Sequence, residues 1–234
     1  MPGLLWGNVP FPTDPFILTG SKSLLIYLFQ QGYYAQLLLV VLTLILSLTL
    51  HEFGHAAAAK IQGDLTAQRA GRLTLNPFAH LDWIGFLMVI LVGIGYAKPV
   101  PTDPQYYRSR YSELWIAAAG PFMNFLIAVI VWNAYLIVIG SGGFSQQAFV
   151  FANTVAGINL LLMIFNLMPL GPLDGSYIFP YLLPKAIRRR YVLWNDRYGT
   201  WAFVGLIVAG FVGLPLGQWL LGISSWLLQK ISFF

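Results

Sequence analysis

The 234-residue chain contains no cysteine and few charged residues. Without cysteine it can form neither disulfide bonds nor thiolate metal sites. Asp, Glu, Lys and Arg make up only 9% of the residues, whereas soluble domains have about 25%. This composition excludes the charged surface of an ordinary soluble protein, so we expect an integral membrane protein.

Three long stretches of the chain lack Asp, Glu, Lys and Arg altogether: residues 23–51, 114–173 and 198–229. One bilayer crossing needs about 20 apolar residues, so the middle stretch has room for two crossings and a turn. The apolar runs predict spanning helices over Ala35–Lys60, Leu114–Ile139, Gln147–Met168 and Thr200–Leu228. Pro215, near the middle of the last run, predicts a kink or a division into two helices.

Basic residues predict which side of the membrane each connection faces. Lysines and arginines flank most spans, whereas the connection at residues 140–147 has no charge. By the positive-inside rule, the basic segments are cytoplasmic and residues 140–147 lie outside. The short apolar stretch Trp83–Ala97 has basic residues on both sides, so it should be a re-entrant segment that enters and leaves on one side. The net charge of +5 therefore reflects topology rather than nucleic-acid binding.

The chain divides into three expected parts. Residues 1–34 should lie at the membrane interface, because prolines interrupt their apolar runs and tyrosines suit the headgroup region. They lack the basic start of a cleavable signal peptide. Residues 35–199 should form the functional membrane core, and residues 200–234 a C-terminal transmembrane part. The remaining length leaves no room for an appended soluble domain of ordinary size.

Two of the three histidines stand in the sequence His51-Glu52-Phe53-Gly54-His55. Positions i and i+4 share one face of a helix, so both imidazoles can reach one metal ion. The adjacent Glu52 can accept a proton from a water molecule at that ion, which is the chemistry of the H-E-x-x-H pattern. Burying these polar groups near the end of an apolar span is costly without partners, so a metal site is favoured over a chance match.

A catalytic zinc usually has three protein ligands, so a third ligand is needed. The candidates are His80, Asp82, Glu113 and Asp174. Asp174 follows the predicted span Gln147–Met168, in a segment whose prolines and glycines can turn a carboxylate back to membrane depth. An Asp-Gly pair after proline is also a common turn. The predicted topology nevertheless places Asp174 at the cytoplasmic side, together with both histidines of the motif.

The segments HEFGH at residues 51–55 and NLMPLGPLDG at residues 166–175 together resemble the paired signatures of the site-2 protease family of intramembrane zinc metallopeptidases. AGPFMN at residues 119–124 resembles the family's Gly-Pro-x-x-Asn element. The resemblance covers Leu38–Tyr177 and is to the compact members, which lack a PDZ or CBS domain. It implies that residues 35–199 are an intramembrane metalloprotease core.

The resemblance also implies roles for individual residues. His51, His55 and Asp174 would hold one catalytic Zn²⁺, and Glu52 would be the general base. This assignment agrees with the chemistry expected of the HExxH pattern itself.

Other polar residues have two interpretations each. Asn166 and Asn124 could donate a hydrogen bond to the oxyanion of the reaction, and we favour Asn166 because Asn124 could equally bond two helices together. His80 and Asp82 could support or gate the zinc site, or cap the segment that begins at residue 83. Gly71–Asn76 alternates polar and apolar residues, which predicts a β-hairpin strand that could pair with an extended substrate or serve no substrate role.

These features predict an all-α, polytopic helical bundle with a short re-entrant segment and a small β-hairpin after the HExxH helix. The predicted function is a zinc endopeptidase that cleaves transmembrane segments of membrane-protein substrates, in regulated intramembrane proteolysis or in clearance of signal-peptide remnants. We expect the active site near the cytoplasmic side of a prokaryotic cell membrane. The sequence indicates no oligomeric state. The alternatives are a divalent metal-ion transporter and a catalytically inactive membrane scaffold.

Overall fold

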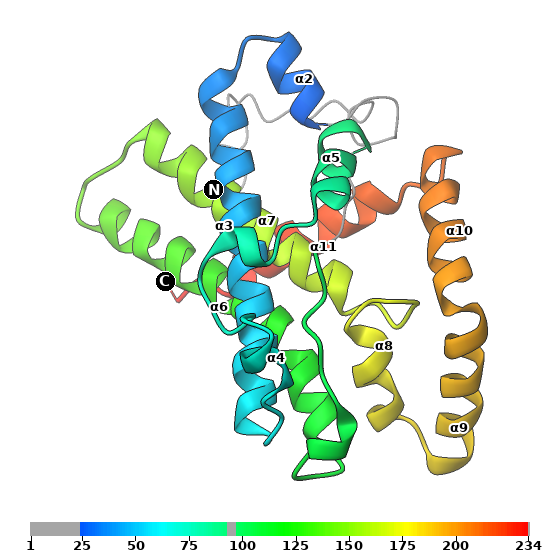
Figure 1. Ribbon diagram of the computed structural model, residues 1–234. Coiled ribbons are helices and arrows are strands. Elements are labelled where there is room, and N and C mark those ends of the chain that lie inside the picture. The colour runs from blue at the N-terminus through cyan, green and yellow to red at the C-terminus, as the bar shows by residue number, and fades with distance from the viewer. Residues whose placement is uncertain (1–23, 93–96, 234) are drawn as a thin grey trace.

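The computed structural model describes residues 24–92 and 97–233 (Figure 1). Its α-helices are α2 (Leu24–Gln30), α3 (Tyr34–Ile61), α4 (Thr66–Arg69), α5 (Trp83–Val92), α6 (Ser112–Gly140), α7 (Gln146–Asn166), α8 (Gly175–Ile178), α9 (Lys185–Trp194), α10 (Thr200–Phe211) and α11 (Leu216–Lys230). The 3-10 helices η1 (Pro77–Ala79), η2 (Pro104–Tyr106) and η3 (Phe179–Leu182) and the π-helical turn η4 (Asn195–Gly199) join them. No strand occurs among these described residues, which confirms the all-α class.

Three described helices, α3, α6 and α7, are long and apolar enough to cross a membrane. The region Thr200–Leu228, predicted as a fourth span, is instead divided into α10 with 12 residues and α11 with 15 residues. The chain turns between them, where Gly213 has φ of 122° and Pro215 immediately precedes α11. Of the two outcomes that Pro215 left open, a kink or a division, the structure has the division. Each half is shorter than a full crossing.

The bundle is built around α6, which packs against both α3 and α7, while α11 packs against α7. Small side chains allow these helices to approach closely. Ala128 of α6 and Ala156 of α7 are fully buried in a cluster with Leu160 and Leu228. A Cβ atom at Gly54 of α3 would lie 2.9 Å from the carbonyl oxygen of Ala119 in α6, so only glycine fits this crossing.

Residues 71–76 form a loop, so the predicted β-hairpin is wrong. Arg72 is buried and donates to the carbonyl oxygens of Lys98 and Pro99 at 3.1 and 3.0 Å. Asn76 caps η1 by accepting a backbone N–H of that helix, so the chain turns there. Nε2 of His80 also donates to the Thr74 carbonyl oxygen, and the Asn76 N–H donates to the Thr74 hydroxyl group. Side-chain bonds thus occupy backbone groups that a strand ladder would need, and they override the alternating pattern.

The stretch Trp83–Ala97 contains helix α5, whose 10 residues are too few to cross a bilayer. Asp82 caps this helix, because its Oδ1 accepts the N–H groups of Ile84 and Gly85 at 3.0 and 2.9 Å. Residues 93–96 lie outside the described part, and the re-entrant course of the stretch stays a prediction.

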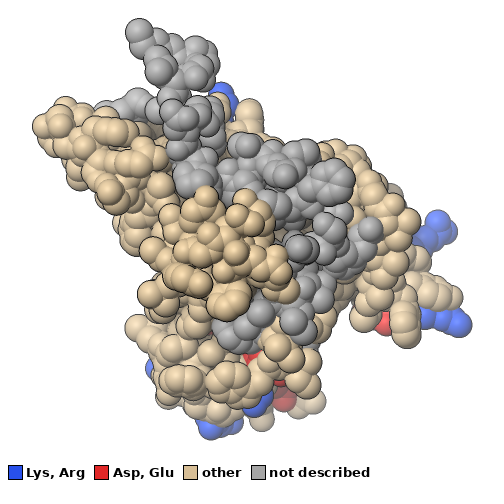
Figure 2. Space-filling model, turned by 90° about the horizontal axis from the view of Figure 1, so that it is seen from above, with Lys and Arg blue, Asp and Glu red and all other residues tan. Residues whose placement is uncertain are grey.

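Of the expected interfacial segment, residues 1–23 lie outside the described part. Helix α2 follows them and packs Leu25 and Leu28 against Val40 of α3. Charged side chains are sparse on the face of the molecule shown in Figure 2, where the visible Lys and Arg side chains lie near the rim.

Candidate metal centre

His51 and His55 lie near the C-terminal end of α3, one turn apart on the same face. The helix is rich in Leu, Val and Ala and contains no proline, so it continues through the motif. Both imidazoles are buried, and their Nε2 atoms are 3.0 Å apart. The HExxH spacing therefore brings the two rings together within one helix.

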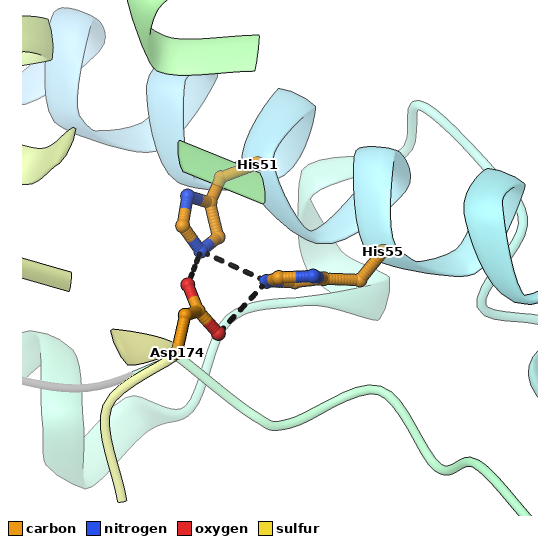
Figure 3. Close-up of side chains that lie close together, drawn as sticks. All are labelled: His51, His55 and Asp174. Atoms are coloured by element: carbon orange, nitrogen blue, oxygen red, sulfur yellow. Dashed lines mark hydrogen bonds and ion pairs between the residues drawn. The ribbon is translucent and has the colours of Figure 1, made fainter. Parts of the chain in front are cut away.

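Asp174 reaches the same point from the turn that follows α7. This turn has Pro169 and Pro172, and Gly171 has φ of 58°, which favours glycine. The two carboxylate oxygens of Asp174 lie 3.2 Å from His51 Nε2 and 3.3 Å from His55 Nε2. Figure 3 shows both rings pointing at this carboxylate.

The turn is tied to the segment that follows it. The side-chain oxygen of Asn195, in η4, accepts the N–H of Gly171 at 3.0 Å. The hydroxyl of Tyr191 in α9 donates to the carbonyl oxygen of Pro169 at 3.1 Å. A Cβ atom at Gly171 would lie 2.8 Å from the Gly199 carbonyl oxygen, so η4 packs directly on the turn that carries Asp174.

The far nitrogen of each imidazole is held by α6. His55 Nδ1 lies 2.7 Å from the carbonyl oxygen of Ile116, and His51 Nδ1 lies 2.5 Å from Oδ1 of Asn124. A carbonyl oxygen can only accept, so Nδ1 of His55 carries a hydrogen and, in the neutral ring, Nε2 keeps its lone pair. Both Nε2 atoms are thereby directed at Asp174.

This arrangement fits a metal ion. The three ligand atoms lie within 4.8 Å of one another. Oδ2 of Asp174 is buried and makes no hydrogen bond. Lone pairs of two imidazoles and a carboxylate repel one another at these distances unless a metal ion or a proton lies among them. Two imidazole nitrogens and one carboxylate oxygen are a usual ligand set for catalytic zinc, which keeps its fourth position open.

Gly120 of α6 has no side chain, and this keeps the space beside the ligand atoms open. A Cβ atom at Gly120 would overlap Nε2 of His55 and would lie 2.6 Å from Nε2 of His51. Any larger residue would therefore occupy the volume in front of the ligand atoms.

Among the candidates for the third ligand, the structure brings only Asp174 into this described cluster. His80 is buried in the loop after α4, where its Nε2 donates to a backbone carbonyl oxygen at 2.9 Å. Asp82 caps α5. The carboxylate of Glu113 accepts a tyrosine hydroxyl at 3.3 Å. None of these three contacts involves a residue of the cluster.

The remaining predicted residues lie on the spanning helices. Glu52 is buried beside the two histidines and interacts electrostatically with His55. Asn166, in the last turn of α7, is half-buried and donates to the carbonyl oxygen of Leu162 at 3.0 Å. Asn124 is fully buried and donates at 2.9 Å to Oδ1 of Asn159 in α7, so it does bond two helices together.

Sequence reasoning missed four contributions to this site. Gly120 stands in the AGPFMN segment, so its signal was present but its role was not recognised. The carbonyl oxygen of Ile116 is a backbone atom and has no signature in the sequence. Asn159 and Asn195 are separated from every motif by several residues, and only the packing of α7 and η4 reveals them.

Comparisons with known proteins agree with this geometry. Residues 39–156 match the profile of peptidase family M50. The chain is 36% identical over 188 residues to a Bacillus subtilis protein named "Putative zinc metalloprotease YwhC", an alignment that covers 78% of this chain and 83% of that protein. It is 26% identical over 204 residues to a Mycolicibacterium smegmatis protein named "Putative zinc metalloprotease Rip2", covering 83% of this chain and 74% of that protein.

A more distant relative is "Zinc metalloprotease MJ0392" of Methanocaldococcus jannaschii, 28% identical over 142 residues, which are 61% of this chain and 33% of that protein. No solved structure gives a significant match. The profile match covers half of the chain, and it includes the HExxH helix and the AGPFMN segment of α6. The chain therefore belongs to peptidase family M50, and it is a zinc metalloprotease.

Proposed function

We propose that this protein is an intramembrane zinc endopeptidase that hydrolyses peptide bonds within or near transmembrane segments of membrane-protein substrates. One observation carries the proposal: His51, His55 and Asp174 converge at the end of a helix apolar enough to span the bilayer. A protease site in this position is reached by segments that lie in the membrane.

His51, His55 and Asp174 would hold the ion, since their lone pairs already face one another. Zinc, when bound, supplies Lewis-acid polarisation of the attacking water and of the scissile carbonyl group. The carboxylate of Glu52 accepts the proton of that water and then donates it to the departing amine nitrogen. Its burial next to His51 and His55 keeps the carboxylate close to the reacting atoms.

Asn166 is the proposed donor to the oxyanion. A side-chain amide carries two hydrogens, and the bond to the Leu162 carbonyl uses one of them. A neutral donor suits a site of low dielectric constant, because it needs no counter-charge. Asn124 is less suited, because it is fully buried and both ends of its amide are held inside the bundle, the oxygen by His51 and the nitrogen by Asn159.

The proposed site faces the cytoplasm. The positive-inside rule places the C-terminal end of α3 on that side, and α5 would enter and leave the membrane there as a re-entrant helix. Hydrolysis needs water, and a substrate helix must unwind before its carbonyl groups are accessible. Substrate helices weakened by Gly, Pro, Asn or Ser near the cytoplasmic side should therefore be cleaved fastest.

The test uses purified protein in liposomes with a single-span reporter substrate. Wild type should bind one zinc ion and cleave the reporter. Glu52→Gln should retain zinc and lose cleavage, since it keeps the ligands but removes the base. Glu113→Gln, a matched change outside the cluster, should leave cleavage intact.

Metal flux measured in the same liposomes separates the proposal from a transporter. A transporter needs no general base, so zinc uptake that persists in Glu52→Gln without any reporter cleavage by wild type would contradict the proposal. Zinc binding by a wild type that neither cleaves the reporter nor moves zinc would indicate an inactive scaffold.

A further inference from the structure

We propose that a chain of buried amides, from Asn159 of α7 through Asn124 of α6, orients the His51 ring and fixes which of its nitrogens carries the hydrogen, so that Nε2 faces the metal site with its lone pair. Asn159 is thus a positioning residue that acts through Asn124. The inference rests on the proposed zinc site, and it adds a residue that no sequence motif of the chain contains.

The chain of hydrogen bonds is continuous and buried. His51 Nδ1 lies 2.5 Å from Asn124 Oδ1, and Asn124 Nδ2 donates to Asn159 Oδ1 at 2.9 Å. Asn159 Nδ2 donates in turn to the carbonyl oxygen of Val155 at 2.8 Å and to Oγ of Ser47 at 2.9 Å. Asn124 and Asn159 are both fully buried, and Ser47 is 2% exposed.

The Val155 carbonyl group fixes which atom donates in each hydrogen bond of this chain. The Val155 carbonyl can only accept, so Asn159 must turn its NH₂ group toward it and its oxygen toward Asn124. Asn124 must then donate to Asn159 and present its own oxygen to His51. Nδ1 of His51 therefore carries the hydrogen, and in the neutral ring the lone pair lies on Nε2, which faces Asp174.

The two histidines reach the same tautomer, with the hydrogen on Nδ1, through different partners. His55 bonds directly to a backbone carbonyl, which is an acceptor in any rotamer. His51 bonds to a side-chain amide, which can turn over and present a donor instead. An amide turned over in this way would favour hydrogen on Nε2 and block metal binding. His51 therefore needs a second group to hold the amide, whereas His55 does not.

Asn159→Leu removes this second group, and it should weaken zinc binding 10- to 100-fold, the usual effect of losing an outer partner of a metal ligand. Zinc affinity is measured by competition with a chelator in detergent-solubilised protein. The visible absorption of the cobalt-substituted protein should change as well, since it reports the geometry of the ligands. His51→Ala, which removes a ligand, tests the site itself and should abolish binding.

The matched control is Asn133→Leu. Asn133 is also a buried amide in a spanning helix, and it donates to the Val129 and Ile231 carbonyl oxygens rather than to any group of the metal site. This variant should lose stability but keep zinc affinity within about twofold of wild type, so it separates a general loss of a buried hydrogen bond from the loss of the relay.

A rescue variant separates orientation from packing. A carboxylate has two acceptor oxygens and cannot present a donor, so Asn124→Asp orients His51 without help from Asn159. The double variant Asn124→Asp/Asn159→Leu should therefore regain the zinc affinity that Asn159→Leu loses. Should Asn159→Leu fail to fold, Asn159→Ser serves instead, because serine bonds to the Val155 carbonyl within its own helix but does not reach Asn124.

Wild-type zinc affinity and an unchanged cobalt spectrum in the Asn159 variant would overturn the relay and leave the proposed site intact. Weakened binding that Asn124→Asp does not restore would also overturn it, because Asn159 would then act through packing. Zinc binding by the His51→Ala variant that equals wild-type binding would instead contradict the proposed site.

Discussion

Gly120 lies so close to His55 that a single added methyl group would overlap the Nε2 atom of the ring. The same methyl group would lie 2.6 Å from the corresponding atom of His51. The helix that supports the two histidines from behind, α6, therefore also determines how much space remains in front of them.

Gly120→Ala should lower proteolytic activity and zinc affinity by about 10- to 100-fold, because the methyl group displaces the ligand atoms. Gly157→Ala in α7 is the matched control, since a Cβ atom there meets nothing within 4 Å. It should keep full activity and gain about 0.4–1 kcal/mol of stability from the less flexible unfolded chain. Equal activity of the two variants would contradict the close approach of α6 to the ligands.

Asn195→Ala should loosen the turn that carries Asp174. The substitution leaves the Gly171 N–H without its acceptor, which costs about 1–3 kcal/mol in unfolding free energy when the group is buried. Zinc affinity, measured by chelator competition, should fall together with the unfolding temperature. Tyr191→Phe removes the weaker contact to the same turn at Pro169 and should have a smaller effect on both. Stability that falls without any change in zinc affinity would show that the turn holds Asp174 independently of η4.

Asp64 should make stability depend on pH outside the membrane. Burial alone raises the pKa of this carboxyl group, but the hydrogen bonds that it accepts from Thr66 and from the Asp103 N–H outweigh burial and lower the pKa. A lowered pKa in the folded state stabilises the fold above the unfolded pKa of about 3.9, and this stabilisation is lost as the pH falls through the folded value.

Asp64→Asn should therefore be less stable than wild type at pH 7, by about 1–3 kcal/mol. The difference in unfolding free energy between the two proteins should shrink as the pH is lowered below about 4, where the carboxylate gains its proton first in the unfolded chain and, at lower pH, in the folded protein. This difference is measured by chemical unfolding of both proteins in detergent at several pH values. A difference that stays constant down to acidic pH would mean that the charge of Asp64 contributes nothing.

The absence of cysteine makes the topology directly testable. Ser141→Cys, in the uncharged connection after α6, should react in intact cells with a maleimide that does not cross membranes. Ser109→Cys, before α6, should react only after the membrane is opened. The reverse labelling pattern would place the metal centre on the outer side and contradict the proposed cytoplasmic site.

Local features of the fold could be predicted because their causes lie close together in the chain. The apolar runs predict α3, α6 and α7, and Pro215 predicts a kink or a division at the point where α10 and α11 are separated. The β-hairpin was wrong because the side chain of Arg72 bonds to carbonyl groups at residues 98–99. The alternation of polar and apolar residues at 71–76 carries no information about a partner more than 20 residues away.

The metal site was only partly predictable, for the same reason. Asp174 was one of several candidates for the third ligand until topology and resemblance favoured it. His80 was equally available by residue type, yet the structure engages it with a backbone carbonyl of its own loop. The residue types alone do not show that Asp174 lies at the cluster and His80 does not, because both side chains follow a turn and both can bind a metal.

The amino-acid sequence alone determined that the chain enters a membrane and that two imidazoles share a helix face, since hydropathy and a four-residue spacing act within one helix. Only the tertiary structure decided which carboxylate lies beside the two imidazoles, which backbone carbonyl holds His55 and which amides of α6 and α7 are linked to His51. These choices depend on how closely the helices pack, and packing is a property of the whole bundle rather than of any one segment.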